Sequence, residues 1–179
     1  MSFASSDFRA TMARFATGVT VVTTALDQTY FGLTVNAFCS VSLNPCLVLV
    51  CLDLTSQTYA VIRQSGVFAV NVLAQEQQHL ARRFACKDLK SKTFDDIPLR
   101  VGETAVPLFS GAIAWVECRV AQEYPGGDHA LLLGEVLSVA YSDDSDAREP
   151  LLYYCSSFLA IPQGYTLNSL PLLMTNAAR

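Results

Sequence analysis

Segments that alternate between apolar and polar residues, or that are continuously apolar and β-branched, recur along the whole chain. Both patterns are typical of strands, because a strand covered on one face alternates and a strand covered on both faces does not. We expect strands at residues 19–25, from Tyr30 onward, and at 46–52, 67–73, 112–120, 131–140 and 151–155. The segment 46–52 is apolar at nearly every position and is therefore expected to be covered on both faces.

A helix is predicted near the start of the chain, over residues 7–16. Its apolar residues recur three or four apart, namely Phe8, Met12, Phe15 and Ala16. Ser5 or Ser6 is expected to cap this helix and Gly18 to end it.

Two further helices are predicted between strands, over residues 56–63 and 76–85. Gly66 is expected to end the first, and Leu80 and Phe84 lie four apart in the second. The connection 86–111 is rich in charged residues and proline, so we expect it to be mostly irregular, either folding over a site or simply crossing the surface.

This pattern predicts a mainly β fold with one core. Six or more strands joined mainly by short turns, such as the turn at Pro125, Gly126 and Gly127, favour a closed antiparallel β-barrel with peripheral helices. A chain of 179 residues is long enough for one domain of this kind.

Small polar residues interrupt the apolar pattern between two predicted strands, in the segment 34–45 (TVNAFCSVSLNP). In an extended backbone its hydroxyls and amide project from one face, while Val35, Ala37 and Val41 enter the core. The small side chains would let a flat ring that forms hydrogen bonds approach the main chain. The alternative is an ordinary bend between two strands.

The composition predicts a second subunit and argues against a nucleic acid or a membrane as a partner. Hydrophobic residues make up 51% of the chain and charged residues only 16%, so we expect a second copy to cover apolar surface in a homodimer. A net charge of −4 argues against a nucleic-acid partner. The longest apolar run is far shorter than the roughly 20 residues of a membrane helix, and residues 1–15 do not form a secretory signal, so a cytoplasmic protein is expected.

Cysteines and histidines show no spacing typical of a redox or metal site. The six cysteines include no C-x-x-C pair, and Cys46, Cys51 and Cys118 lie in apolar runs, which favours reduced core thiols. His79 and His129 are the only histidines, so a metal site is not expected. The chain also lacks the G-x-G-x-x-G fingerprint of dinucleotide-binding folds.

Seven motifs follow one another in an order that covers nearly the whole chain: FATGVTVVTT (15–24), TVNAFCSVSLNP (34–45), CLDLTSQT (51–58), VFAVNVL (67–73), LARRFA (80–85), GGDHALLLGEV (126–136) and PLLYY (150–154). In this order they resemble the flavin reductase-like family. Its members are small NAD(P)H:flavin oxidoreductases that serve as reductase components of two-component flavin monooxygenases, such as those acting on 4-hydroxyphenylacetate, phenol or styrene. The resemblance implies a split β-barrel that binds FMN at a dimer interface, with residues 1–161 as the domain and 162–179 as a C-terminal tail.

The resemblance also implies a set of flavin-binding residues. Those against the isoalloxazine would be Thr34, Asn36, Ala37, Ser40 and Val41. Those along the ring edge, the ribityl chain and the phosphate would be Cys51, Leu52, Asp53, Ser56 and Thr58. Arg83, with Phe84, would lie beside the phosphate, which a forked guanidinium fits well. Lys92 is a weaker candidate for the same role.

His129 and Tyr153 are the residues expected to contact the nicotinamide nucleotide. The glycines before His129 place it at a bend where a ligand can approach the backbone, and its imidazole can donate a hydrogen bond to a carboxamide. Tyr153 could stack on a ring, although packing in the core is the ordinary expectation. For His129 too, a structural role in a turn is the alternative.

The expected reaction is hydride transfer from NADH or NADPH to N5 of FMN or FAD, followed by release of reduced flavin to a separate oxygenase. Such a reaction needs alignment of the two cofactors and no catalytic side chain, which agrees with the absence of a triad or a carboxylate pair. Two alternatives remain: an FMN oxidase like pyridoxamine-phosphate oxidase, and a dimer that binds flavin or another small ligand without turnover.

Overall fold

Strands dominate the structure, which was obtained as a computed structural model and describes residues 3–142 and 148–161. The helices are α1 (Ser5–Met12), α2 (Gln57–Ser65) and α3 (Gln78–Ala85), with short 3-10 turns η1 (Gln75–Gln77) and η2 (Leu89–Ser91). The strands are β1 (Thr17–Gly18), β2 (Thr20–Leu26), β3 (Thr29–Val35), β4 (Phe38–Leu43), β5 (Cys46–Asp53), β6 (Val67–Val72), β7 (Leu99–Val101), β8 (Pro107–Phe109), β9 (Ala114–Gly126), β10 (His129–Tyr141), β11 (Leu152–Tyr154) and β12 (Ser157–Leu159). The predicted tail 162–179 lies outside the described residues.

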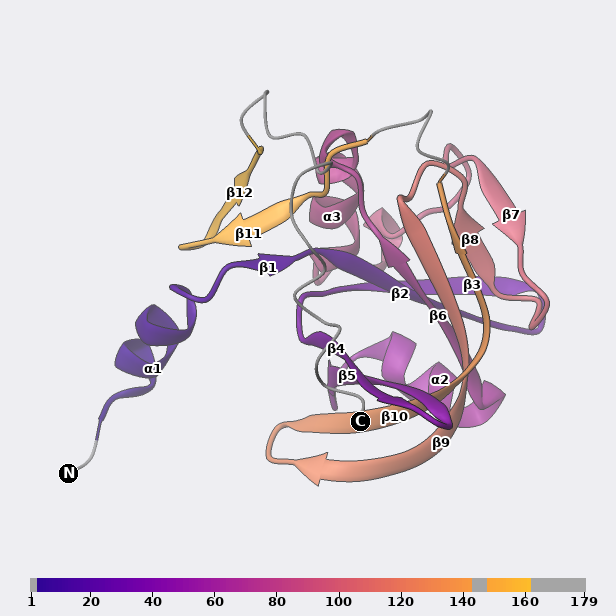
Figure 1. Cartoon of the computed structure of the whole chain (residues 1–179), viewed down its shortest axis with the longest axis horizontal. Helices are drawn as coiled ribbons and strands as arrows, with labels where there is room; N and C mark the ends of the chain where they lie inside the picture. The colour runs from indigo at the N-terminus through magenta and orange to yellow at the C-terminus, as the bar shows by residue number, and fades with distance from the viewer. Residues whose placement is uncertain (1–2, 143–147, 162–179) are drawn as a thin grey trace.

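Seven antiparallel strands form the main sheet, in the order β3-β2-β6-β9-β10-β5-β4 (Figure 1). Its turns follow from local sequence: Asp27 and Gln28 both have positive φ angles at the reversal from β2 to β3. Gly127, with φ of 75°, makes the turn from β9 to β10. A smaller sheet, β1-β11-β12, and the hairpin β7-β8 lie beside the main sheet.

The two edge strands of the main sheet, β3 and β4, follow one another directly in the chain. The three peptide steps from Val35 to Phe38 span at most about 11 Å, so these opposite edges must come close together. The Cys51 N–H of β5 also donates a hydrogen bond to the Ala37 carbonyl in this connection (3.0 Å). The sheet therefore curls round on itself, although no ladder joins β3 to β4. The predicted mainly β class is confirmed, whereas closure of the barrel is not.

Two clusters of buried side chains lie on the two faces of β2, to which Val22 and Val21 belong respectively. One fills the inside of the curl and includes Val22, Val50 and Phe68. The other is covered by α3 and the β7-β8 hairpin, and includes Phe84 and Phe109. The predicted irregular connection 86–111 thus contains a short hairpin that closes the second cluster, because β8 contributes Phe109 to it.

The α2 and α3 helices agree with the sequence pattern. Gly66 ends α2 with φ of 72°, as predicted. In α3 the residues Leu80, Ala81 and Phe84 are buried, which gives the predicted amphipathic helix a core-facing side.

The α1 helix differs from its prediction at both ends and in its packing. It runs from Ser5 to Met12 instead of over 7–16, and its N-cap is Ala4, so Ser5 and Ser6 lie inside the helix. Gly18 belongs to strand β1 and does not end the helix. Figure 1 shows α1 standing away from the sheet, and none of its residues is buried.

The prediction of which side chains of residues 34–45 enter the core is only partly correct. Val35 is buried as expected, but the chain bends after it and leaves Ala37 exposed. A register shift between Ser40 and Ser42 then turns Val41 outward, and this side chain is 51% exposed. The predicted inward position of Ala37 and Val41 is therefore wrong.

Strand β5 is covered on one face only. Val48, Val50 and Leu52 are buried, while Leu49 and Cys51 between them are half-exposed. Of the three cysteines predicted in the core, only Cys118 is buried. All six cysteines are free in the structure.

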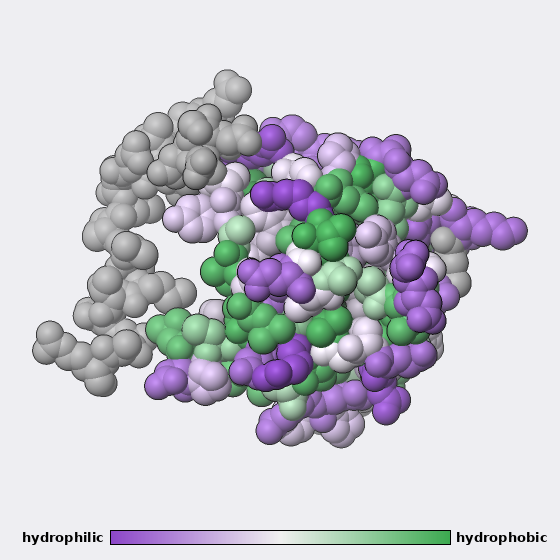
Figure 2. Space-filling view, turned by 90° about the vertical axis from the view of Figure 1, so that its right-hand side faces the viewer, coloured by the Kyte–Doolittle hydropathy of each residue, from purple (hydrophilic) through white to green (hydrophobic). Residues whose placement is uncertain are grey.

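Polar and apolar residues mix on the face of the molecule that lies on the right in Figure 1. Figure 2 shows this face, where small hydrophobic patches alternate with hydrophilic residues. The helix α1, which includes the exposed Phe8 and Met12, lies on the side opposite to this face, at the left in Figure 1.

Candidate functional site

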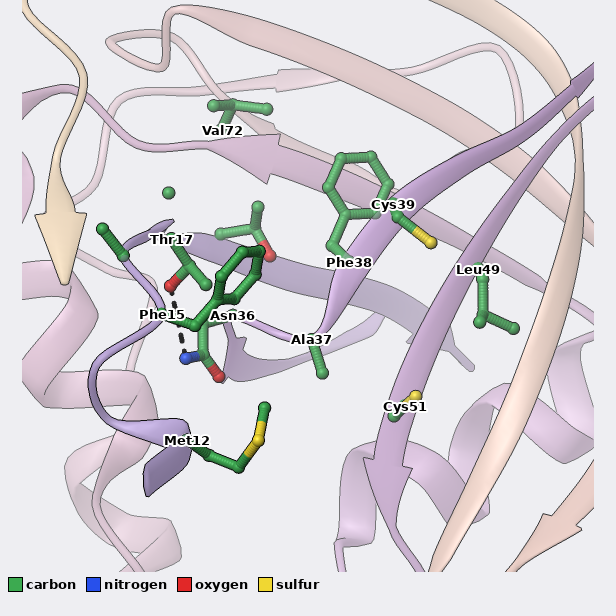
Figure 3. A pocket seen from close by; sticks show the side chains of 13 residues that line it. Met12, Phe15, Thr17, Asn36, Ala37, Phe38, Cys39, Leu49, Cys51 and Val72 are labelled. Carbon is green, nitrogen blue, oxygen red and sulfur yellow. Dashed lines mark hydrogen bonds between the residues drawn. The ribbon is translucent and has the colours of Figure 1, made fainter. Parts of the chain in front are cut away.

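A groove of about 660 Å³ lies beside the connection between β3 and β4, and we call it the first groove. Its lining comes from the N-terminal arm (residues 3–16), from β1 and the start of β2, and from the curled edge of the sheet. These residues are Met12, Phe15, Ala16, Thr17, Gly18, Thr20, Asn36, Ala37, Phe38, Cys39, Leu49, Cys51 and Val72. Figure 3 shows most of them around the opening. The volume is in the usual range for a small-molecule site.

One polar group stands out among these mainly apolar walls. The Asn36 amide donates a hydrogen bond to the Thr17 hydroxyl (3.3 Å; Figure 3), which links the β3-β4 connection to β1. The amide oxygen of Asn36 accepts no hydrogen bond from the described residues, so it remains available to a ligand. Such an arrangement of apolar walls with one oriented amide suits a flat ring with a polar edge.

The wall beside Asn36 is formed by small side chains. Ala37 is exposed in the groove, and Cys51 follows on the neighbouring strand. Burial raises the pKa of the Cys51 thiol, and nearby Cys39 raises it further. Both effects favour the neutral thiol, so this wall behaves as an apolar surface at neutral pH.

A second groove, of about 850 Å³, lies on the other side of Asn36, which lines both. It runs between α3 and the β11-β12 hairpin and contains two predicted site residues besides Asn36, namely Thr34 and Tyr153. The Thr34 hydroxyl donates to the Ala81 carbonyl (2.7 Å), which ties β3 to α3.

Asp53 and His129 meet at the end of the β5-β10 ladder, where they pair in register. Asp53 accepts hydrogen bonds from the hydroxyl (2.6 Å) and the N–H (2.7 Å) of Thr55, and these bonds lower its pKa. His129 Nδ1 lies 2.7 Å from the Asp128 carboxylate, and this bond lowers the pKa of Asp128. Asp53 and His129 line neither groove, so the structure places them together but apart from Asn36.

The predicted residues after β5 divide between the core and the surface. Leu52 is fully buried, and Thr58 is buried with its hydroxyl donating to the Gly32 carbonyl (3.0 Å). Any contact that these two residues make with a ligand would therefore involve the main chain. Ser56 is the N-cap of α2, and its hydroxyl makes no capping hydrogen bond. That hydroxyl and the first N–H groups of the helix remain available to an anion.

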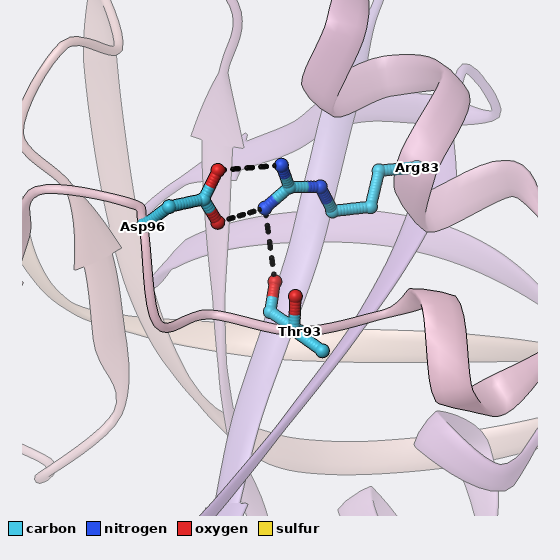
Figure 4. A network of polar contacts seen from close by, with 3 residues as sticks. All are labelled: Arg83, Thr93 and Asp96. Carbon is cyan, nitrogen blue, oxygen red and sulfur yellow. Dashed lines mark hydrogen bonds and ion pairs between the residues drawn. The ribbon is translucent and has the colours of Figure 1, made fainter.

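Arg83 is held by an internal partner. Its guanidinium forms a bidentate ion pair with Asp96, with distances of 2.5 and 2.7 Å, and also donates to the Thr93 carbonyl (3.2 Å; Figure 4). The pair raises the pKa of Arg83 and lowers that of Asp96. Phe84 beside it is fully buried in the second core cluster. A role for Arg83 with a phosphate would require this pair to open.

The structure thus brings together only part of the predicted set. Asn36, Ala37 and Cys51 share the first groove, whereas Ser40 and Val41 lie on β4 outside it. Lys92 is half-buried, and this burial lowers its pKa. The arm residues Met12 and Phe15 were not predicted as site residues, because their spacing was interpreted as the apolar face of an amphipathic helix. The FATG motif at Phe15, already part of the resemblance, was the signal that could have found them.

Within the described residues, no cluster of three or more His, Cys, Asp or Glu could hold a metal ion, and no helix is long and apolar enough to cross a membrane.

Comparison with known proteins identifies the family. The family described as flavin reductase like domain matches residues 12–162. The reductase subunit HsaB of a flavin-dependent monooxygenase from Rhodococcus jostii is 36% identical over 162 residues, covering 89% of this chain and 80% of HsaB. FMN reductase (NADH) SmoA from Agrobacterium fabrum is 36% identical over 154 residues, covering 86% of this chain and 84% of SmoA.

A solved structure supports the same assignment. The NADH:FAD oxidoreductase SgcE6 from Streptomyces globisporus, in complex with NAD and FAD fragments, superposes with a TM-score of 0.82 at 35% identity. The match covers 90% of this chain and 94% of SgcE6. The chain therefore belongs to the flavin reductase like domain family. This confirms the predicted class, an NAD(P)H:flavin oxidoreductase that uses a flavin and a reduced nicotinamide nucleotide, and favours it over both alternatives.

Proposed function

We propose that the first groove holds the isoalloxazine ring of the flavin, with Asn36 at its polar edge and Ala37 and Cys51 against its face. The observation that carries this proposal is the shared position of these three residues in one mainly apolar groove. Their side chains fit the ring chemically, since small apolar groups allow close approach and a fixed amide can bond a heteroatom.

In this arrangement the protein supplies alignment. When bound, the flavin supplies the hydride-accepting N5 atom and NADH or NADPH supplies the hydride. Asn36, fixed by Thr17, orients the ring in its plane. Phe15 on the arm and the side chains of Cys39 and Cys51 line the groove and would exclude water from it once the ring is bound. The low number of polar contacts keeps binding reversible, as release of reduced flavin to a separate oxygenase requires.

The phosphate of the flavin would lie toward the start of α2. Ser56 and the free N–H groups there are its proposed partners, because a helix N-terminus attracts an anion. Asp53 is an acceptor held by Thr55 and would bond ribityl hydroxyls. The predicted roles of Arg83 and Lys92 with the phosphate, and of His129 and Tyr153 with the nicotinamide nucleotide, stay predictions.

A homodimer is proposed because two apolar surfaces lack cover. The first is α1, whose eight residues include no buried one, although an isolated helix of this length is marginal in water. The second is the outer face of β5 and β10, where Leu49 pairs with Leu133 and Cys51 with Leu131. A second copy that packs its arm against this chain would cover both. Light scattering at micromolar concentration tests this, and a monomer would contradict it.

Three further predictions, on the domain bounds, the barrel and the location in the cell, are also proposals. The domain is proposed to span residues 1–161, with 162–179 as a tail. The curled sheet, whose edges meet at Asn36 and Ala37, supports a split barrel. Six free thiols support a location in the reducing cytoplasm.

The experiment that tests the proposed function is NADH and NADPH oxidation by the purified protein with FMN or FAD added. We expect oxidation well above the rate without protein, saturating in both flavin and pyridine nucleotide. Flavin binding without any acceleration would leave a binding protein without turnover and would refute the proposal.

A further inference from the structure

The second groove carries a cation that the first groove lacks. Arg82 on α3 lines it, together with Gln78 one turn earlier and Ala85 one turn later, so this side of the helix faces the groove. No Asp or Glu lines the groove, and no carboxylate among the described residues forms an ion pair with Arg82. Its neighbour Arg83, by contrast, is neutralised by Asp96.

The Arg82 side chain is already held in place within the protein. Its guanidinium carbon lies 5.2 Å from the centre of the Phe158 ring on β12. With the Gln78 amide turned so that its oxygen faces the guanidinium, this oxygen accepts from Arg82 Nε (3.2 Å) and Nη2 (2.8 Å). A guanidinium oriented in this way loses less entropy on binding an anion, and it can form two parallel bonds with a phosphate.

The rest of the second groove offers the other groups that a nucleotide needs. Phe158 and Tyr153 pack edge to face, with ring centres 5.5 Å apart, and give an aromatic wall on which a base can stack. Ser156 and Ser157 add hydroxyls at the turn of the β11-β12 hairpin, suited to ribose hydroxyls. The volume of about 850 Å³ is sufficient for a mononucleotide.

The two grooves meet at Asn36. A ligand with its redox-active ring in the first groove and a second nucleotide attached can therefore extend into the second. FAD and NADH both have this construction, since each joins a redox nucleotide to adenosine phosphate, whereas FMN lacks the second half. The second groove has the charge and the aromatic wall for that half.

We propose, resting on the proposed function of the first groove, that the second groove binds the adenosine 5′-phosphate half of a dinucleotide and that Arg82 contacts its phosphate. The source of this half is either FAD or the pyridine dinucleotide. Both present the same chemistry, and the mononucleotides FMN and reduced nicotinamide mononucleotide separate them.

The test compares the wild type with Arg82→Met, which keeps the length of the side chain and its helix propensity but removes the charge. Four values are measured: the Kd of FMN, the Kd of FAD, and the KM of NADH and of reduced nicotinamide mononucleotide. We expect the variant to weaken one dinucleotide about tenfold, as is typical for the loss of a charge-assisted contact, and to leave both mononucleotides unchanged. A change confined to FAD assigns the groove to the flavin, and a change confined to NADH assigns it to the cosubstrate.

Arg63→Met serves as the matched control. Arg63 is an exposed arginine on α2 that pairs with Glu123 and lines neither groove, so its loss should leave all four values unchanged. As a second measurement, 5′-AMP should compete with the same dinucleotide in the wild type and lose this effect in Arg82→Met.

The proposal is overturned if Arg82→Met leaves both dinucleotides unchanged, or if it weakens the mononucleotides equally. Either result would give Arg82 a structural or general electrostatic role. Failure of the proposed function has a different signature, because wild-type protein would then not transfer hydride from reduced nicotinamide mononucleotide to FMN at all.

Discussion

A bulky side chain at Ala37 should block flavin binding without affecting the fold. Ala37 is exposed, its side chain is directed into the first groove (Figure 3), and only its carbonyl takes part in a structural hydrogen bond, with the Cys51 N–H. The substitution Ala37→Phe therefore adds an aromatic ring to the groove and leaves the hydrogen bond intact. Surface substitutions of this kind usually change stability by no more than about 0.5 kcal/mol.

The expected loss of affinity can be worked out from the area that the new ring denies to the flavin. If phenylalanine covers roughly 100 Å² of the groove wall, about 25 cal/mol per Å² gives about 2.5 kcal/mol. This corresponds to roughly a 70-fold increase in the Kd of FMN. Quenching of flavin fluorescence during titration measures the Kd, and thermal melting followed by circular dichroism checks the fold.

Ala37→Ser is the matched control, since it adds only one hydroxyl at the same position and should change the Kd less than threefold. A folded Ala37→Phe protein that binds FMN with wild-type affinity would refute the location of the ring in the first groove.

Other substitutions test the core, an ion pair and the cosubstrate. In Gly32→Ala the new Cβ would lie 2.7 and 2.8 Å from two ring carbons of Phe84, so urea unfolding should show a loss of about 1–3 kcal/mol; unchanged stability would mean that α3 can shift freely. Asp96 has a folded pKa below its unfolded value because Arg83 donates to it, so its contribution to stability is present above about pH 4 and is lost as the pH falls through the folded pKa. The melting temperatures of the wild type and Asp96→Asn should therefore differ most near neutral pH and draw closer as the pH falls below about 4, and a difference that grows with acidification would contradict this sign. His129→Ala should raise the KM of the pyridine nucleotide severalfold more than that of flavin, and steady-state kinetics that show equal effects would remove its predicted role.

The strands and the α2 and α3 helices could be predicted from sequence because their signals are local. Gly66 and the pair Asp27 and Gln28 determine their own turns, and the spacing of Leu80 and Phe84 defines one face of α3. The extent of α1 could not be predicted in this way. Its apolar spacing is helical, but Phe15 lies beyond the end of the helix and lines the first groove.

The site was harder to predict because it depends on contacts between distant segments. The register shift near Ser40 turns Val41 outward, and one residue of slip reverses the face of every following side chain. The choice between Arg82 and Arg83 shows the same limit. Both are basic residues in one motif, and only the position of Asp96, thirteen residues after Arg83, decides which guanidinium is neutralised.

The central claim is that the flavin ring lies in the groove between the N-terminal arm and the β3-β4 connection. A crystal structure of the protein with FMN tests it most directly. We expect the isoalloxazine to contact Phe15, Asn36 and Ala37, with its phosphate toward Ser56. FMN bound elsewhere, with the first groove closed by the protein's own side chains, would contradict the claim.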